Sequence, residues 1–123
     1  MPTTVPTIAV LDDDDSVRHA LSQLLRSAGF DALPFATAEE LLESPARPPV
    51  DCLIADVNLP GMSGVALVHA LAAAGRAIPT ILITARDDAA TLELIRRAGS
   101  VPHLRKPFSD EELFEAIARI LSA

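Results

Sequence analysis

Apolar residues are arranged in two different patterns along this chain. Five short segments are rich in apolar and β-branched residues, and the stretches between them place apolar residues three or four positions apart. The first pattern is typical of buried strands and the second of amphipathic helices. Strands are therefore predicted at residues 7–11, 32–35, 52–55 and 80–83, with a weaker one at 101–104.

Start and stop signals for helices separate these strands. The first helix is predicted to begin near Asp14 or Asp15 and to stop at Gly29. Thr37 and Ser109 are each followed three residues later by glutamate, which is the capping-box pattern of a helix start. The two other helices are predicted over residues 63–74 and 87–97.

Strands that alternate with helices favour an α/β fold, in which helices cover both faces of a parallel sheet. Proline is tolerated at sheet edges but not in central strands, so Pro34 and Pro102 place the second and fifth strands at the edges. Right-handed crossovers then give the strand order 2-1-3-4-5 of flavodoxin-like doubly wound sheets, with five helices. Ligands of such sheets bind at the carboxyl ends of the strands, where the strand order reverses.

Composition narrows the classes of function. The 123 residues fit one domain, so residues 1–123 are expected to form a single unit. A formal net charge of -7 opposes contact with a nucleic-acid backbone, and no direct nucleic-acid partner is expected. No apolar run approaches the roughly 18 residues of a membrane span, and the start MPTTVPT lacks a signal-peptide pattern. A cytoplasmic protein without membrane contact is expected.

Four consecutive aspartates follow the first predicted strand directly. A helix start can use one or two of these charges, and Asp14 or Asp15 is placed to cap the first helix. Asp12 and Asp13 are then expected to converge with Asp56, which follows the third predicted strand. Three converging carboxylates need a cation or large pKa shifts, and hard oxygen ligands suit Mg²⁺.

Two further polar residues stand at predicted strand ends. Thr84 follows the fourth strand, where its hydroxyl could donate to an incoming oxyanion, although an isolated threonine is more often a plain strand former. Lys106 follows the fifth strand, and a lone lysine there is usually a solvated charge. Opposite three acids, however, Lys106 is a candidate cation for a phosphate group.

Four segments at these strand ends resemble the motifs of response-regulator receiver domains of two-component systems. They are IAVLDDDDSVR, DCLIADVNLPGMSG, ILITARDD and LRKPF, and the resemblance covers nearly the entire chain. The segment FATAEELL is similar to receivers of nitrogen-fixation-type transcription regulators, which often carry a C-terminal helix-turn-helix. Since the sequence ends at Ala123, both a stand-alone receiver and part of a longer regulator stay open.

The resemblance implies a phosphorylation site built from these residues. It assigns Asp56 as the phosphoacceptor, which takes a phosphoryl group from the phosphohistidine of a sensor histidine kinase or of a phosphotransfer protein. Asp13 and Asp56 would bind Mg²⁺ together with the main-chain carbonyl of Asn58, and Asp12 would act mostly through water. The chain would be a signalling receiver, with no activity beyond self-phosphorylation and autodephosphorylation.

The resemblance also implies a conformational switch. Thr84 and Lys106 would contact the phosphoryl oxygens, and the Lys106–Pro107 bond would be cis. Movement of Thr84 would rearrange the fourth helix, the fifth strand and the fifth helix, the region through which a homodimer is expected. His103 departs from the family pattern, because such receivers often carry tyrosine or phenylalanine at this position.

Two alternatives are open from the sequence. The segment from Asp13 to Val17 fits the D-x-D-x-T/V pattern of haloacid dehalogenase-type phosphatases, but this interpretation leaves Asp56 without a role and the chain without room for a cap. The other alternative is a receiver-like interaction module that is never phosphorylated. Such modules usually lose one or more of the acids, the threonine or the lysine, whereas all five positions are filled in this sequence.

Overall fold

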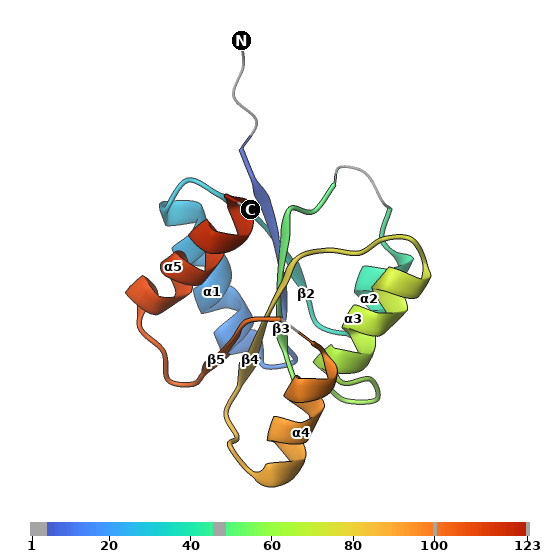
Figure 1. Cartoon of the computed structure of the whole chain (residues 1–123). Coiled ribbons are helices and arrows are strands. Elements are labelled where there is room, and N and C mark those ends of the chain that lie inside the picture. Colours follow the sequence, from blue (N-terminus) through green and yellow to red (C-terminus); the bar gives the residue numbers. More distant parts are fainter. Residues whose placement is uncertain (1–4, 46–48, 100, 123) are drawn as a thin grey trace.

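A parallel five-stranded sheet in the order β2-β1-β3-β4-β5 forms the centre of the protein (Figure 1). The computed structural model describes residues 5–45, 49–99 and 101–122. Strands and helices alternate along these stretches, so the flavodoxin-like doubly wound fold and its predicted strand order are confirmed. The elements are β1 (Thr7–Leu11), α1 (Asp15–Ser27), β2 (Asp31–Phe35), α2 (Ala38–Glu43), β3 (Cys52–Asp56), α3 (Gly64–Ala73), β4 (Thr80–Thr84), α4 (Ala89–Arg97), β5 (His103–Arg105) and α5 (Asp110–Leu121).

Successive residues of each central strand enter opposite layers of the core. In β1, Ile8 and Val10 pack in the layer beneath α1 and α5, whereas Ala9 and Leu11 pack in the layer beneath α2 and α3. This alternation is the two-residue period of a strand with both faces covered. All five residues of β3 and of β4 are buried, which explains why these strands appear in the sequence as nearly uninterrupted apolar runs.

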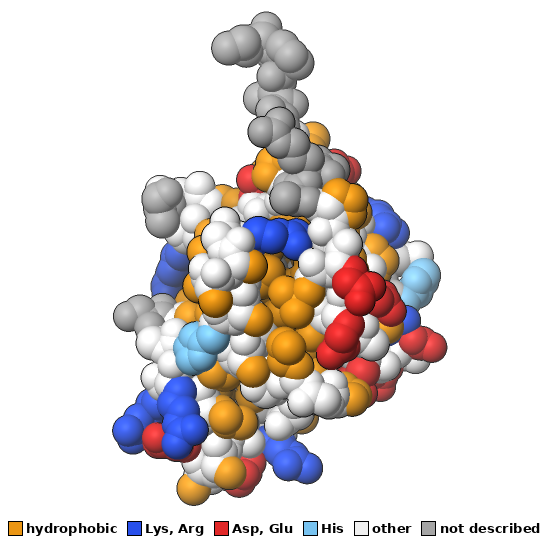
Figure 2. Space-filling view, turned by 90° about the vertical axis from the view of Figure 1, so that its right-hand side faces the viewer, with side chains coloured by type: hydrophobic (Ala, Val, Ile, Leu, Met, Phe, Trp, Pro, Cys, Tyr) orange, Lys and Arg blue, Asp and Glu red, His pale blue; other side chains and the backbone are white. Residues whose placement is uncertain are grey.

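The face that carries α2 and α3 retains apolar side chains at its surface. Figure 2 shows them gathered near the middle of this face, with acidic side chains along one side. Phe35, Leu42, Met62 and Val68 are half-buried residues that pack against the core cluster of this layer. The face is therefore an extension of the core rather than a separate apolar surface.

The sheet edges accommodate proline in two different ways. Pro34 lies inside the edge strand β2, opposite Val10, where its missing N–H costs no ladder bond on the outer side. The fifth strand begins at His103, two residues later than predicted, so Pro102 precedes the strand. The carbonyl of Pro102 still accepts a hydrogen bond from the Leu82 amide at 2.9 Å, which ties this segment to β4.

Helices begin at side-chain caps, though not always as predicted. Asp14 caps α1 by accepting from the amides of Ser16 and Val17, and α5 begins with the full capping box of Ser109. The pattern at Thr37 forms only half a box, because the partner glutamate accepts from the preceding Ala36 amide instead. The fourth helix begins two residues later than predicted. Among the helices of the described stretches, none combines the length and apolar character needed to cross a membrane.

Candidate functional site

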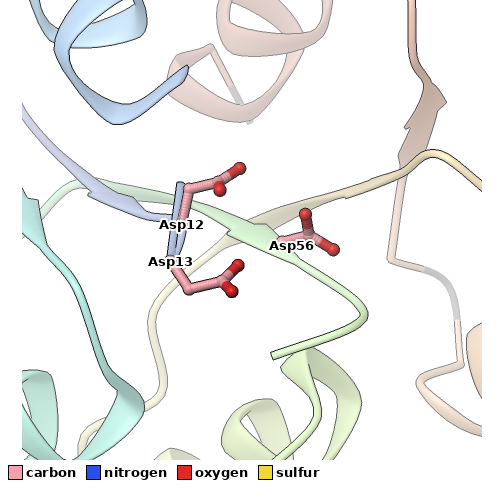
Figure 3. A group of neighbouring side chains, drawn as sticks. All are labelled: Asp12, Asp13 and Asp56. Carbon is pink, nitrogen blue, oxygen red and sulfur yellow. The ribbon is translucent and has the colours of Figure 1, made fainter. Parts of the chain in front are cut away.

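Three aspartates meet at the carboxyl ends of β1 and β3. Asp12 and Asp13 lie in the turn that follows β1, and Asp56 is the last residue of β3. One carboxylate oxygen from each lies within 4.8 Å of the others, and Figure 3 shows the three side chains directed into the same space. These strands are neighbours in the sheet, and the strand order reverses between them, so the cluster occupies the expected ligand-binding edge.

The three carboxylates differ in exposure. Asp12 is 1% exposed and Asp56 is 8% exposed, whereas Asp13 is open to solvent. Each buried carboxylate accepts a hydrogen bond from the amide two residues ahead: Asp12 from Asp14 at 2.9 Å and Asp56 from Asn58 at 2.8 Å. These short loops aim the buried side chains toward the cluster and leave Asp13 at its entrance.

Lys106 completes the cluster from the opposite side. Its Nζ lies 3.1 Å from Oδ2 of Asp12 and 3.1 Å from Oδ2 of Asp56. Burial lowers the pKa of Lys106, but the hydrogen bonds and negative charges of Asp56 and Asp12 outweigh it and raise the pKa above its usual value. Lys106 is therefore a cation at neutral pH. The Lys106–Pro107 bond is cis, as predicted.

The charges of the cluster do not balance. Three carboxylates face one ammonium group, which leaves an excess of two negative charges in a partly buried space. A divalent cation would remove this excess, and carboxylate and carbonyl oxygens are the ligands that Mg²⁺ prefers. The donor set of Asp12, Asp13 and Asp56 therefore fits Mg²⁺.

Thr84 lies at the carboxyl end of β4 and is 2% exposed. Its hydroxyl donates to the carbonyl of Arg86 at 3.1 Å and accepts from the amide of the same residue at 3.0 Å. The β3–β4 register pairs Asp56 with Ile83, so Thr84 stands one residue beyond that pair. In this conformation the hydroxyl is bonded within its own turn. It would have to give up its hydrogen bond to the Arg86 carbonyl to reach a group on Asp56.

Gly64 belongs to the site although sequence reasoning assigned it no role. A Cβ at this position would lie 2.5 Å from the main-chain oxygen of Asp56, closer than any real contact of this kind. The Gly64 amide also donates a hydrogen bond to the main-chain carbonyl of Val57 at 3.0 Å. The start of α3 therefore packs directly against the end of β3. A glycine just after the helix cap Ser63, where it is a poor helix former, was the available signal.

We expect Gly64→Ala to destabilise the protein by about 2 kcal/mol or more, because backbone atoms of α3 and β3 would have to separate. It should also weaken metal binding by displacing Asp56. Urea unfolding and a Mg²⁺ titration measure the two effects. Gly75→Ala is the matched control: its strain comes from a φ of 71° with nothing within 4 Å, so metal binding should not change. Equal effects of both variants on Mg²⁺ would contradict the contact argument.

The phosphatase alternative requires Asp15 to act beside Asp13. The structure turns Asp15 outward: its side chain is 89% exposed and pairs with Arg18. The buried partner of the cluster is instead Asp56, together with Lys106. The geometry therefore disfavours a D-x-D nucleophile pair.

Comparison with known proteins gives the family. Residues 8–118 match the response regulator receiver domain. Nodulation protein W of Bradyrhizobium diazoefficiens is 37% identical over 115 residues, which cover 94% of this chain and 51% of that protein. The response regulator protein TodT of Pseudomonas putida is 38% identical over 121 residues, which cover 98% and 53%. The chain thus spans about half the length of the curated relatives it matches.

Solved structures agree with the sequence relatives. The crystal structure of FixJ-N superposes with a TM-score of 0.84 at 33% identity and covers 98% of this chain and 96% of that one. The resemblance to nitrogen-fixation-type regulators is thereby confirmed. With the fold, the strand-end acids and these relatives in agreement, the chain belongs to the family of response regulator receiver domains.

Proposed function

We propose that this receiver accepts a phosphoryl group on Asp56 in a Mg²⁺-dependent reaction. The observation that carries the proposal is that Asp56 contacts one group that can hold phosphoryl oxygens and lies on the strand next to another. Lys106 contacts its carboxylate, and the neighbouring strand β4 ends in Thr84. Asp12 also contacts Lys106 but is 1% exposed, against 8% for Asp56, so Asp56 is the more accessible nucleophile.

The reaction transfers a phosphoryl group from the phosphodonor to the carboxylate of Asp56. A carboxylate oxygen of Asp56 bonds to phosphorus while the bond from phosphorus to the donor atom breaks, and the leaving group takes up a proton. Lys106 moves from the carboxylates to a phosphoryl oxygen. Asp13, Asp56 and the carbonyl of Asn58 would hold Mg²⁺, Asp12 would act through water, and the bound ion would neutralise charge on the phosphoryl group. Self-phosphorylation and autodephosphorylation are the only reactions proposed for the chain itself.

Acetyl phosphate and Mg²⁺ test the proposal without a partner protein. Intact-mass analysis is expected to show the addition of one phosphoryl group, which EDTA prevents. Absence of any addition at high phosphodonor concentration, with the protein folded, would contradict the proposed function.

The phosphodonor partner is proposed to be a sensor histidine kinase or a phosphotransfer protein. An apolar groove of about 480 Å³ is lined in part by Lys106, which contacts the carboxylate of Asp56. Apolar walls are typical of protein docking sites, and the charged end fits a phosphorylated histidine. The groove is lined by Val17, Ala20, Leu21, Leu24, Lys106, Pro107, Phe108 and Asp110.

The output is proposed to be a rearrangement of α4, β5 and α5 that creates a homodimer face. A phosphoryl group that engages Thr84 removes its hydroxyl from the Arg86 carbonyl and so displaces the turn before α4. His103 is exposed on β5, within this region. We propose further that residues 1–123 act as a single receiver domain in the cytoplasm, without direct nucleic-acid contact.

Phosphorylation is expected to change amide hydrogen exchange from residue 89 to residue 121, because the Thr84 turn leads directly into α4. Exchange mass spectrometry of the phosphorylated chain measures the change, with the Asp56→Asn variant under the same conditions as the control. Sedimentation measures the accompanying dimer. Identical exchange in this region, with phosphorylation confirmed by mass, would reject the proposed switch.

A further inference from the structure

Arg18 is a charged residue near the site that has no role in the chemistry above. It lies on the second turn of α1, and its side chain is only 19% exposed. Nη1 donates to the main-chain carbonyl of Asp12 at 2.8 Å, and Nη2 pairs with the carboxylate of Asp15. The guanidinium group therefore connects the helix to the strand end that carries the acids.

The Asp12 carbonyl belongs to the peptide unit that joins Asp12 to Asp13. The orientation of this unit sets the direction in which Asp13 leaves the strand. The other hydrogen bonds at this point are a 3.3 Å bond from the Asp12 amide to the Phe35 carbonyl, and two to the Asp12 side chain, from the Asp14 amide at 2.9 Å and from Lys106 at 3.1 Å. Of these bonds, the Arg18 bond is the one that holds the carbonyl.

We propose that Arg18 is a positioning residue of the phosphorylation site: it fixes the Asp12–Asp13 peptide so that both carboxylates face Asp56. This inference rests on the proposed function, since it concerns the Mg²⁺ site of that function. The side-chain hydrogen bonds of Arg18 go to the Asp12 carbonyl and to Asp15 rather than to the acceptor carboxylate.

The charge of Arg18 allows positioning to be separated from electrostatics. A positive group near the cluster repels a cation, so loss of the charge by itself should strengthen Mg²⁺ binding. Loss of a hydrogen bond that orients a ligand residue should weaken it. The two effects have opposite signs, and the sign of the change identifies which one dominates.

The test compares two arginines of the same helix. Arg26 also donates to a main-chain carbonyl six residues away, that of Ala32, but this carbonyl lies on β2 and away from the acids. Mg²⁺ affinity of the unphosphorylated protein is measured by amide chemical shifts for Arg18→Met and Arg26→Met. We expect about tenfold weaker binding for Arg18→Met and an unchanged affinity for Arg26→Met.

A metal-free measurement and a rescue complete the test. In EDTA, the Asp14 amide should exchange faster in Arg18→Met than in the parent, because the turn is less ordered. Arg18→Lys, which keeps a charged donor for the Asp12 carbonyl, should restore most of the affinity. If Arg18→Met does not fold, Arg18→Gln replaces it with the same expectation, since the glutamine side chain is shorter than that of arginine and carries no charge.

Equal or tighter Mg²⁺ binding in the variant, or equal losses in both arginine variants, would overturn the assignment. Labelling of the parent by acetyl phosphate separates this proposal from the proposed function. A labelled parent with unchanged affinity in Arg18→Met refutes positioning alone. An unlabelled parent, in which Arg18→Met still weakens Mg²⁺ and speeds Asp14 exchange, refutes the phosphoacceptor role and leaves positioning intact.

Discussion

Replacing Asp56 with asparagine is expected to abolish phosphoryl uptake from acetyl phosphate. Asparagine has nearly the same shape and can keep the hydrogen bond from the Asn58 amide, so the end of β3 should be preserved. It lacks the anionic oxygen that must bond to phosphorus, and it gives Lys106 one carboxylate partner instead of two. Intact-mass analysis in the presence of Mg²⁺ measures the loss.

Asp12→Asn is the informative control for this experiment. Asp12 is also bonded to Lys106 at 3.1 Å, so it is the carboxylate that could be mistaken for the acceptor. The variant should still accept one phosphoryl group, though more slowly, because the acceptor is intact and only the charge around the metal is reduced. Equal labelling of Asp56→Asn and the parent would refute the assignment of the acceptor.

Replacing Asp13 with asparagine is expected to weaken Mg²⁺ binding by about tenfold or more, since a charged ligand at the entrance of the cluster is lost. Asp15→Asn, two residues further along the chain, should leave the affinity for Mg²⁺ unchanged. Its side chain is 89% exposed, pairs with Arg18 and lies outside the group of three carboxylates. Calorimetric titration with MgCl₂ measures both variants.

The comparison controls for charge, because both variants remove one negative charge from the same acidic run. A difference between them therefore reports the position of the carboxylate rather than the net charge. Equal losses would mean that the long-range field of the acids, and not ligation by Asp13, determines the affinity for Mg²⁺.

The sequence by itself determined the features that depend on local signals and on periodicity. The short apolar segments that alternate with helical patterns along the chain predicted a parallel sheet, because such a sheet needs helices to cover both of its faces. Pro34 identified an edge strand through its missing N–H. The convergence of Asp12, Asp13 and Asp56 followed from the strand order alone, since the ends of adjacent parallel strands meet.

Boundaries were less predictable where local signals compete. The fifth strand begins at His103 because pairing with β4 sets its extent. The residues on either side of Pro102 do not by themselves specify which of them pairs with β4. The Thr37 box is incomplete for a similar reason. The sequence places Glu40 where its side chain can reach back to the start of α2. The direction of the chain before α2 decides that it accepts from the amide of Ala36 rather than from that of Thr37.

Only the tertiary structure decided how the site is held. Lys106 bonds to residues 94 and 50 positions away, and that contact depends on the packing of whole elements. Thr84 bonds to the backbone of Arg86, because a threonine hydroxyl readily bonds to main-chain groups near it in the sequence. Gly64 is required by a close approach between α3 and β3 that leaves no room for a Cβ, a steric fact that exists only after the chain has folded.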